Sequence, residues 1–253
     1  MPEPKRILVL AATADETDQL RAAADKLALE MILGCADDAG TLRLNFSTRD
    51  SALHIVEYVQ QNPVVAIIPV GDEPTPSAAR AASMIGLPFH PPRAADACSN
   101  KAALRRKLST PDLITIGASA ASELRIQCIM TAGKLRVLAA IEGCPILGRA
   151  KGGDVDFPSP PVTFKSLPPE IQSITIEWLQ KLIPTLGLKH GPVNVDFSTR
   201  SNSLSVTNVS LCYSPTDALH FRIPLVDSDI SYAEVIIRNA LDLDTSRIHL
   251  DIK

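Results

Sequence analysis

Histidine and cysteine side chains can bind transition metals and act as nucleophiles. The chain has five histidines, and none lies in an HExxH motif or at a Cys/His spacing typical of zinc sites: His54, His90, His190, His220 and His249. Beside Gly191, His190 is open to two interpretations, a hydrogen-bonded structural imidazole or a ligand-binding one. The histidine pattern predicts no zinc site.

Five cysteines are scattered without a CxxC spacing, and an odd number cannot pair completely within one chain: Cys35, Cys98, Cys128, Cys144 and Cys212. We expect reduced thiols in a cytoplasmic protein. No GxSxG motif occurs, and no cysteine has the context of a known nucleophile. For Cys144, before Pro145, we favour an ordinary loop thiol over a reactive one.

Glycine-rich phosphate loops are also missing from the sequence. The turn after the first strand-like run is Ala-Ala-Thr-Ala-Asp, without the glycines that let a pyrophosphate approach the backbone. Gly152 and Gly153 stand in a polar stretch that lacks the Gly-Lys-Ser/Thr ending of a P-loop. We expect a mobile loop there and no dinucleotide site in the first part of the chain.

Composition limits the partners. The 253 residues are 45% hydrophobic, the formal net charge is −3, and no Lys/Arg run exceeds three residues, so nucleic acid is not expected as a partner. No apolar stretch reaches the ~18 residues of a membrane span, and the start of the chain does not resemble a secretory leader. We therefore expect a soluble cytoplasmic protein that binds neither nucleic acid nor membrane.

The first hundred residues alternate between strand and helix patterns. Apolar runs suited to buried strands occupy Ile7–Ala12, Glu30–Cys35 and Val64–Pro69. Helical spacing follows each run: a helix capped by Thr13 and Glu16 that reaches about Leu29, a second capped by Asp50 or Ser51 that ends near Pro63, and a third from Thr75 to Gly86. The pattern predicts a parallel sheet covered by helices on both faces.

The second half predicts an antiparallel sheet. Strands at Glu123–Met130 and Leu135–Ile141 flank a turn at Thr131–Lys134, and one face of this hairpin should be buried. A helix from Pro168-Pro169 to Gly187, with Trp178 in the core or at an interface, precedes a strand through Asp196. Four further elements are expected after it: a turn at Ser198–Asn202, a strand Leu204–Leu211, a helix capped by Ser231 and Glu234, and a short strand at Arg247–Ile252.

Several of these segments resemble the ATP-grasp ligases, namely the carboxylate–amine ligases and proteins like carbamoyl-phosphate synthase. The matching residues are Asp72-Glu73, Ala78-Ala79, Gly86-Leu87-Pro88, Asn100-Lys101, the hairpin from Glu123, Leu186-Gly187, Gly191-Pro192, Asp196 and Ile-Arg-Asn-Ala-Leu at 237–241. The resemblance implies an α/β protein with a pre-ATP-grasp-like domain at 1–108 and a smaller α+β domain at 109–253. Only 22 positions separate Lys101 from Glu123 (123 − 101 = 22), too few for the lid domain that closes over the nucleotide in that family.

The resemblance also assigns site residues. It implies nucleotide contacts for Lys101, Glu123 and Asn208, and places Asp196 where the family has its first metal-binding carboxylate. The alternatives are a solvated Lys101 in the first turn of a helix, and a structural Asp196 that caps the turn toward Ser198 or faces solvent.

In working members of the family the following strand carries Glu, Asn and Arg at alternate positions. The matching residues here are Thr207, Val209 and Leu211, whereas Asn208 would point to the opposite face of the sheet.

Because phosphoryl transfer depends on positioning and on neutralising charge, one aspartate without a lid is not enough for it. The sequence predicts a truncated, degenerate ATP-grasp-like protein without ligase activity or cofactor. We expect it to bind a small molecule in the interdomain cleft or a protein partner, or to form a homodimer. The alternative is an active ATP- and magnesium-dependent carboxylate–amine ligase whose minimal site uses Lys101, Glu123, Asp196 and Asn208.

Overall fold

The computed structural model describes residues 4–36, 40–48, 50–108, 123–142, 164–200, 203–214 and 230–243. Its elements, in chain order, are β1 (Lys5–Leu10), α1 (Ala14–Lys26), β2 (Leu29–Cys35), β3 (Leu42–Arg43), α2 (Ser51–Gln61), β4 (Ala66–Pro69), α3 (Thr75–Ile85), α4 (Pro92–Ser99), α5 (Lys101–Leu108), β5 (Glu123–Thr131), β6 (Lys134–Glu142), η1 (Phe164–Ser166), α6 (Pro169–Leu186), β7 (Gly191–Arg200), β8 (Ser203–Ser210) and α8 (Tyr232–Ala240).

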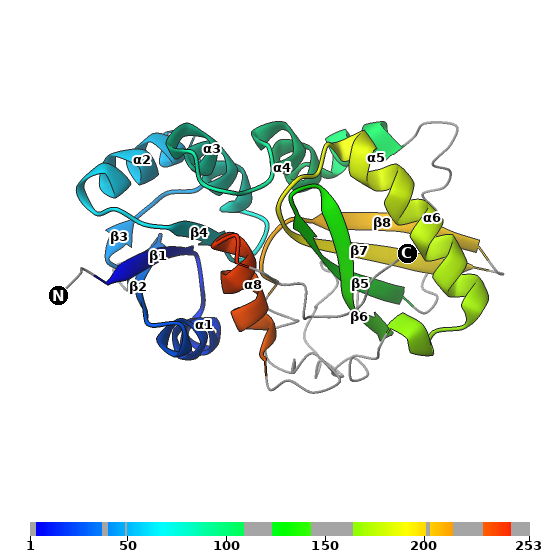
Figure 1. The fold of residues 1–253 in the computed structure, drawn as a ribbon. Coiled ribbons are helices and arrows are strands. Elements are labelled where there is room, and N and C mark those ends of the chain that lie inside the picture. The colour runs from blue at the N-terminus through cyan, green and yellow to red at the C-terminus, as the bar shows by residue number, and fades with distance from the viewer. Residues whose placement is uncertain are drawn as a thin grey trace, which may run out of the picture.

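The first sheet is parallel and has the strand order β3-β2-β1-β4 (Figure 1). Ile7 to Leu10 of β1 are fully buried, because helices cover both faces of the sheet. Helices α2 and α3 pack on the side of Leu8 and Leu10, while α1 and α8 pack on the side of Ile7 and Val9. These are the three layers that the alternating pattern predicted.

Local signals explain where the helices begin and end. Glu16 accepts a hydrogen bond from the Thr13 backbone N–H, as predicted for a capping box. Gly86 ends α3 in the left-handed conformation with φ 76°, which glycine adopts without steric cost. The expectation that α1 reaches Leu29 was wrong: α1 stops at Lys26, because Leu29 already pairs with Lys5 as the first residue of β2.

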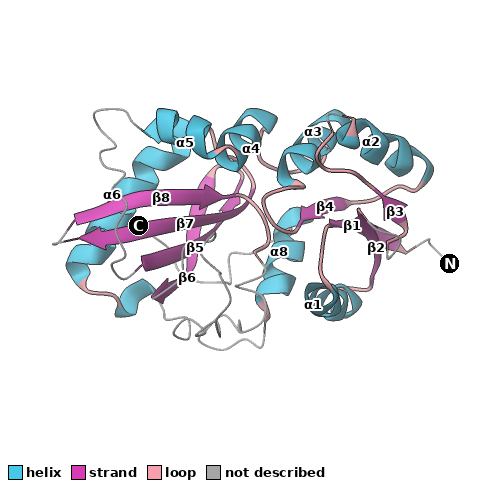
Figure 2. Cartoon of the chain, turned by 180° about the vertical axis from the view of Figure 1, so that it is seen from behind, coloured by secondary structure: helices cyan, strands magenta, loops and turns pink. Residues whose placement is uncertain are grey.

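The second sheet is antiparallel and has the order β6-β5-β7-β8 (Figure 2). Ala132 and Gly133, both with positive φ, form the predicted turn between β5 and β6. Helix α6 packs on one face of the sheet, ends at left-handed Gly187 as predicted, and brings Trp178 against the edge of the core. The α/β class with an added antiparallel α+β part is confirmed.

Residues from the second part also complete the first sheet. Tyr213, just after β8, forms a parallel bridge with Val70: its N–H donates to the Pro69 carbonyl, and its own carbonyl accepts from Gly71. Tyr213 stacks on Tyr232 at the start of α8, with ring centroids 5.3 Å apart. The core of the first sheet therefore contains side chains from both ends of the chain.

Some expectations fall outside the described residues: the loop with Gly152-Gly153, the thiol of Cys144, His220, and the strand at Arg247–Ile252 with His249. The boundary at residue 108 stays a prediction. Over the described ranges, no helix combines the length and the apolar character that crossing a membrane requires.

Candidate functional site

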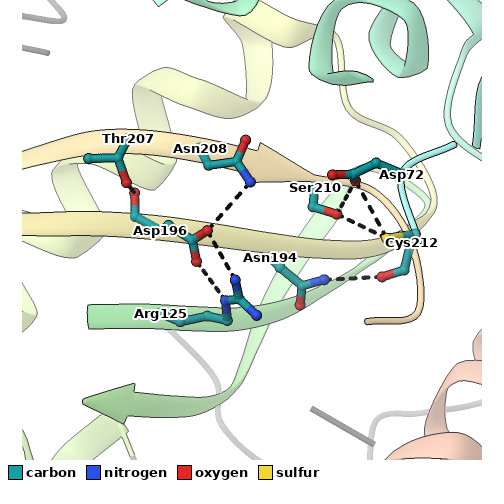
Figure 3. Close-up of polar contacts among 8 residues, drawn as sticks. All are labelled: Asp72, Arg125, Asn194, Asp196, Thr207, Asn208, Ser210 and Cys212. Carbon is teal, nitrogen blue, oxygen red and sulfur yellow. Dashed lines mark hydrogen bonds and ion pairs between the residues drawn. The ribbon is translucent and has the colours of Figure 1, made fainter. Parts of the chain in front are cut away.

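Along β7, one face of the second sheet is apolar and the other is polar. Val193, Val195 and Phe197 of β7 point toward α6 and are fully buried. The residues between them, Asn194 and Asp196, point the other way, as Figure 3 shows. Seven polar side chains on this side define what we call the polar face: Arg125 and Gln127 of β5, Asn194, Asp196 and Ser198 of β7, and Asn208 and Ser210 of β8.

Arg125 holds the carboxylate of Asp196 with two hydrogen bonds (Figure 3). Its Nε donates to Oδ1 at 2.6 Å and its Nη2 donates to Oδ2 at 3.1 Å. The two residues lie directly opposite each other on β5 and β7, and their side chains are 5% and 15% exposed. Asp196 is therefore a paired residue within a strand, so the alternative in which it caps a turn or faces solvent was wrong, and metal binding by Asp196 stays a prediction.

A β-bulge decides which residues of β8 join the polar face. Val206 pairs with Phe197, but Asn208 pairs with Asp196, so Thr207 is an extra residue on β8. Asn208 consequently points toward Asp196, and its Nδ2 lies 3.4 Å from Oδ2 (Figure 3). The expectation that Asn208 faces the opposite side was wrong, because strict alternation along the strand took no account of the bulge. Val209 and Leu211 lie in the apolar core instead.

The sequence prediction also misplaced the turn between β7 and β8, which it put at Ser198–Asn202. The pairing of β7 with β8 continues to Arg200 opposite Ser203, so Ser198 belongs to the strand.

At its far end the polar face meets the first sheet. Ser210 Oγ donates to Asp72 Oδ1 at 2.5 Å, and Cys212 Sγ lies 3.6 Å from the same oxygen. Asp72 follows β4, so this contact joins the two parts of the chain. Asn194 Nδ2 donates to the Cys212 carbonyl at 3.0 Å and holds the chain where it leaves β8 (Figure 3).

Two of the four predicted site residues are in contact, a third pairs with the same strand, and Lys101 lies on a helix. Asp196 and Asn208 are in contact. Lys101 is the exposed first residue of α5, and Asn100 before it caps that helix by accepting hydrogen bonds from the N–H groups of Ala102 and Ala103. Glu123 begins β5 opposite Ser198. Nucleotide contacts by Lys101, Glu123 and Asn208 stay predictions.

Two buried histidines lie where the two parts meet. His90 accepts from the Lys189 N–H at Nδ1 (3.3 Å) and its Nε2 bonds the Pro192 carbonyl (3.0 Å), an arrangement that suits the neutral ring with the proton on Nε2. Burial, and to a smaller extent the nearby His190, lowers the pKa of His90 to about 4. His190 Nε2 bonds the Asn239 carbonyl at 2.7 Å. These contacts agree with the structural interpretation of His190.

The sequence prediction missed Arg125, Gln127, Asn194, Ser210 and Asp72. A signal was present for three of them, since Arg125 and Gln127 alternate with apolar residues in β5, and Asn194 precedes Asp196 by two positions. The contact of Asp72 with Ser210 joins residues 138 apart in sequence, and no local pattern indicates it. Among the described residues, no group of three or more His, Cys, Asp or Glu side chains could hold a metal ion.

Sequence comparison finds no matching family model and no matching curated protein. Solved structures do match. An L-amino acid ligase from Bacillus licheniformis is 15% identical with a TM-score of 0.73, over 95% of this chain and 75% of that one. A phosphoribosylglycinamide synthetase from Anaerococcus prevotii is 16% identical with a TM-score of 0.73, over 96% and 76%.

A third match is an N5-carboxyaminoimidazole ribonucleotide synthetase solved as an ADP complex. It is 8% identical with a TM-score of 0.68, over 96% of this chain and 78% of that one. These neighbours are ATP-grasp ligases, and each is longer than this chain. The resemblance stated from the sequence is confirmed at the level of structure: the chain has the fold of the ATP-grasp ligases.

Proposed function

We propose that this protein is a binding protein built on a shortened ATP-grasp fold, without ligase activity. The observation that carries the proposal is the pairing of Asp196 with Arg125. In the family this position supplies a metal-binding carboxylate, and here both carboxylate oxygens already accept hydrogen bonds from a guanidinium. A carboxylate held in this way is a poor ligand for magnesium.

Electrostatics adds to this argument. A unit positive charge about 5 Å from a divalent ion opposes it by about 7 kcal/mol at an effective dielectric constant near 20. Magnesium also needs several hard oxygen ligands in a near-octahedral arrangement. In the register of the structure, the alternate positions that lie on the side of Asp196 are Asn208 and Ser210 of β8 and Cys212 just after it. None of these is the glutamate or arginine expected of a working member.

A small molecule fits the described surface better than a large protein partner. Among the described residues, three large apolar side chains are exposed, Leu53, Met84 and Leu243. A stable protein interface has a larger apolar centre. The polar face, in contrast, offers seven hydrogen-bonding side chains on three adjacent strands.

One observation favours the alternative, an active carboxylate–amine ligase with a minimal site. Asn208 lies beside Asp196, so a carboxylate and an amide oxygen share the face that would hold magnesium. One of the solved neighbours, moreover, binds ADP. Under this alternative, Asp196 would exchange Arg125 for a metal ion, and Lys101 would contact a phosphate.

Titration with ATP and MgCl₂, followed by thermal unfolding, tests the proposal. A ligand at a hundred times its Kd stabilises the fold by about 2.7 kcal/mol. For a chain of this size, that raises Tm by roughly 5–10 °C. We expect no magnesium-dependent rise. A rise that disappears in Asp196→Ala but persists in Asp18→Ala, an exposed aspartate of α1, would overturn the proposal and support the ligase.

A further inference from the structure

Three buried side chains on the polar face carry atoms without hydrogen-bond partners. Gln127 is fully buried, and neither its Nε2 nor its Oε1 has a partner in the structure. Asn194 and Ser198 are each 2% exposed, and Asn194 Oδ1 and Ser198 Oγ also lack partners. These are four of the eight buried side-chain atoms without a partner among the described residues. Their position on one face of one sheet indicates a common cause.

Strand register places these groups side by side, yet in the structure they make no hydrogen bond to one another. Gln127 lies directly between Asn194 on β7 and Ala139 on β6, and Ala139 has no hydrogen-bonding side chain. The amide of Asn194 is fixed, because its Nδ2 donates to the Cys212 carbonyl. A buried polar atom without a partner costs about 1–3 kcal/mol, so native proteins seldom keep several in one place unless something else binds them.

The charges of the polar face restrict the ligand. Its cation and its anion, Arg125 and Asp196, neutralise each other at 2.6 Å. The atoms without partners belong to uncharged amide and hydroxyl groups. A phosphate or carboxylate would bring a negative charge next to Asp196 without a free cation among the described residues of this face. An uncharged ligand avoids that cost.

Counting donors and acceptors gives the chemical class. Gln127 presents two donor hydrogens and one acceptor oxygen, and Asn194 adds a second acceptor. A primary carboxamide is complementary to this set: one of its N–H groups reaches Gln127 Oε1, the other reaches Asn194 Oδ1, and its carbonyl accepts from Gln127 Nε2. Residues directly opposite on neighbouring strands have Cβ atoms about 5 Å apart, so one small group can bridge them.

We infer that the polar face binds a small molecule through a primary carboxamide group held between Gln127 and Asn194. The inference rests on the proposed function, because it names the ligand class of the same binding protein. It also explains why the face carries uncharged amides in the middle of two strands, where apolar side chains would cost less.

Propionamide and propionate form a matched pair of probes, because they have nearly the same shape and differ in charge and in donor hydrogens. With a Kd of about 10 mM, 100 mM propionamide would favour the folded state about eleven-fold. This raises Tm by about 3–5 °C. We expect propionamide to raise Tm of the full chain and propionate to leave it unchanged.

Two variants locate the response. Gln127→Met keeps the shape of the side chain and removes its hydrogen bonds, so the rise with propionamide should disappear. Thr175→Val is the matched control. Thr175 Oγ1 is also buried without a partner, but it lies on helix α6 and not on the polar face. Thr175→Val should keep the full response. Ligand-observed NMR with the wild-type chain checks the same binding without any variant.

The outcomes separate this inference from the proposed function. If propionamide and propionate both leave Tm unchanged and NMR shows no binding, water satisfies the amides, and the inference is wrong whatever ATP does. If Gln127→Met keeps the propionamide response, the site lies elsewhere and the inference is also wrong. A response to ATP with magnesium would refute the proposed function alone, since the propionamide experiment does not depend on it.

Discussion

Replacing Arg125 with methionine tests whether Asp196 depends on its internal partner. Methionine keeps the length and the apolar stem of the side chain but leaves the Asp196 carboxylate without its two hydrogen bonds from the guanidinium. Breaking a buried ion pair by removing one partner costs about 3–5 kcal/mol. The Asp196 side chain is 15% exposed and keeps Asn208 nearby, so we expect the lower end, about 3 kcal/mol.

Urea unfolding measures this cost. With an m value of about 3 kcal/mol per molar, the midpoint should fall by about 1 M without a change in slope. Arg80→Met is the matched control, because Arg80 pairs with Asp96 at the surface, where both side chains are more than 40% exposed. A surface pair contributes about 0–1 kcal/mol, so this variant should change the midpoint little.

A double variant isolates the charge. In Arg125→Met with Asp196→Asn, no unpaired charge remains, so at least half of the lost stability should return. If the double variant is as unstable as Arg125→Met alone, the loss comes from the packing or other contacts of Arg125. The reasoning about Asp196 would then be refuted.

Three further predictions concern the stability of the fold outside the polar face. The pKa of His90 is lower in the folded protein (about 4) than in the unfolded chain (6.5), so its contribution to stability is complete above pH 6.5 and is lost as the pH falls toward 4. His90→Gln should flatten the dependence of urea midpoints on pH in this range, whereas the exposed His54→Gln should not. Gly187→Ala should cost about 1 kcal/mol by urea unfolding, because φ is 68° and a Cβ would meet no other atom within 4 Å, so a larger cost would contradict a purely backbone effect. Ser231→Ala removes the acceptor for the Glu234 N–H at the start of α8 and should cost about 1 kcal/mol, while Ser231→Asp should keep most of the stability.

Sequence patterns predicted the elements whose signals are local. The apolar run around Ile7–Leu10 and the terminators Gly86 and Gly187 depend on neighbouring residues only, and the structure has them where they were expected. The end of α1 was predicted too far along the chain. The apolar spacing of the helix continues through Leu27, but the residues from Leu29 onward pair with β1 as a strand. Competition between a helix and a strand for the same residues is decided by tertiary contacts, which spacing does not contain.

The site was less predictable for a similar reason. Alternation places residues on a face only if the strand is regular, and the extra Thr207 moves Asn208 to the side of Asp196. The pairing of Arg125 with Asp196 depends on the register of β5 against β7, which joins positions 71 apart in sequence. Asp196 could therefore be picked out as unusual from the sequence, but its partner could not.

The junction between the two sheets bears on how binding at the polar face would affect the rest of the molecule. Asn194 holds the Cys212 carbonyl, Cys212 and Ser210 contact Asp72, and the next residue, Tyr213, pairs with Val70 at the edge of the first sheet. A ligand between Gln127 and Asn194 would thus lie one hydrogen bond away from the segment that joins the sheets. Because Asn194 uses its Nδ2 for the junction and would offer its Oδ1 to the ligand, binding would fix the same amide from both sides. The expected consequence is a tighter connection between the two parts of the chain, and it follows from hydrogen bonds rather than from any movement of the sheets.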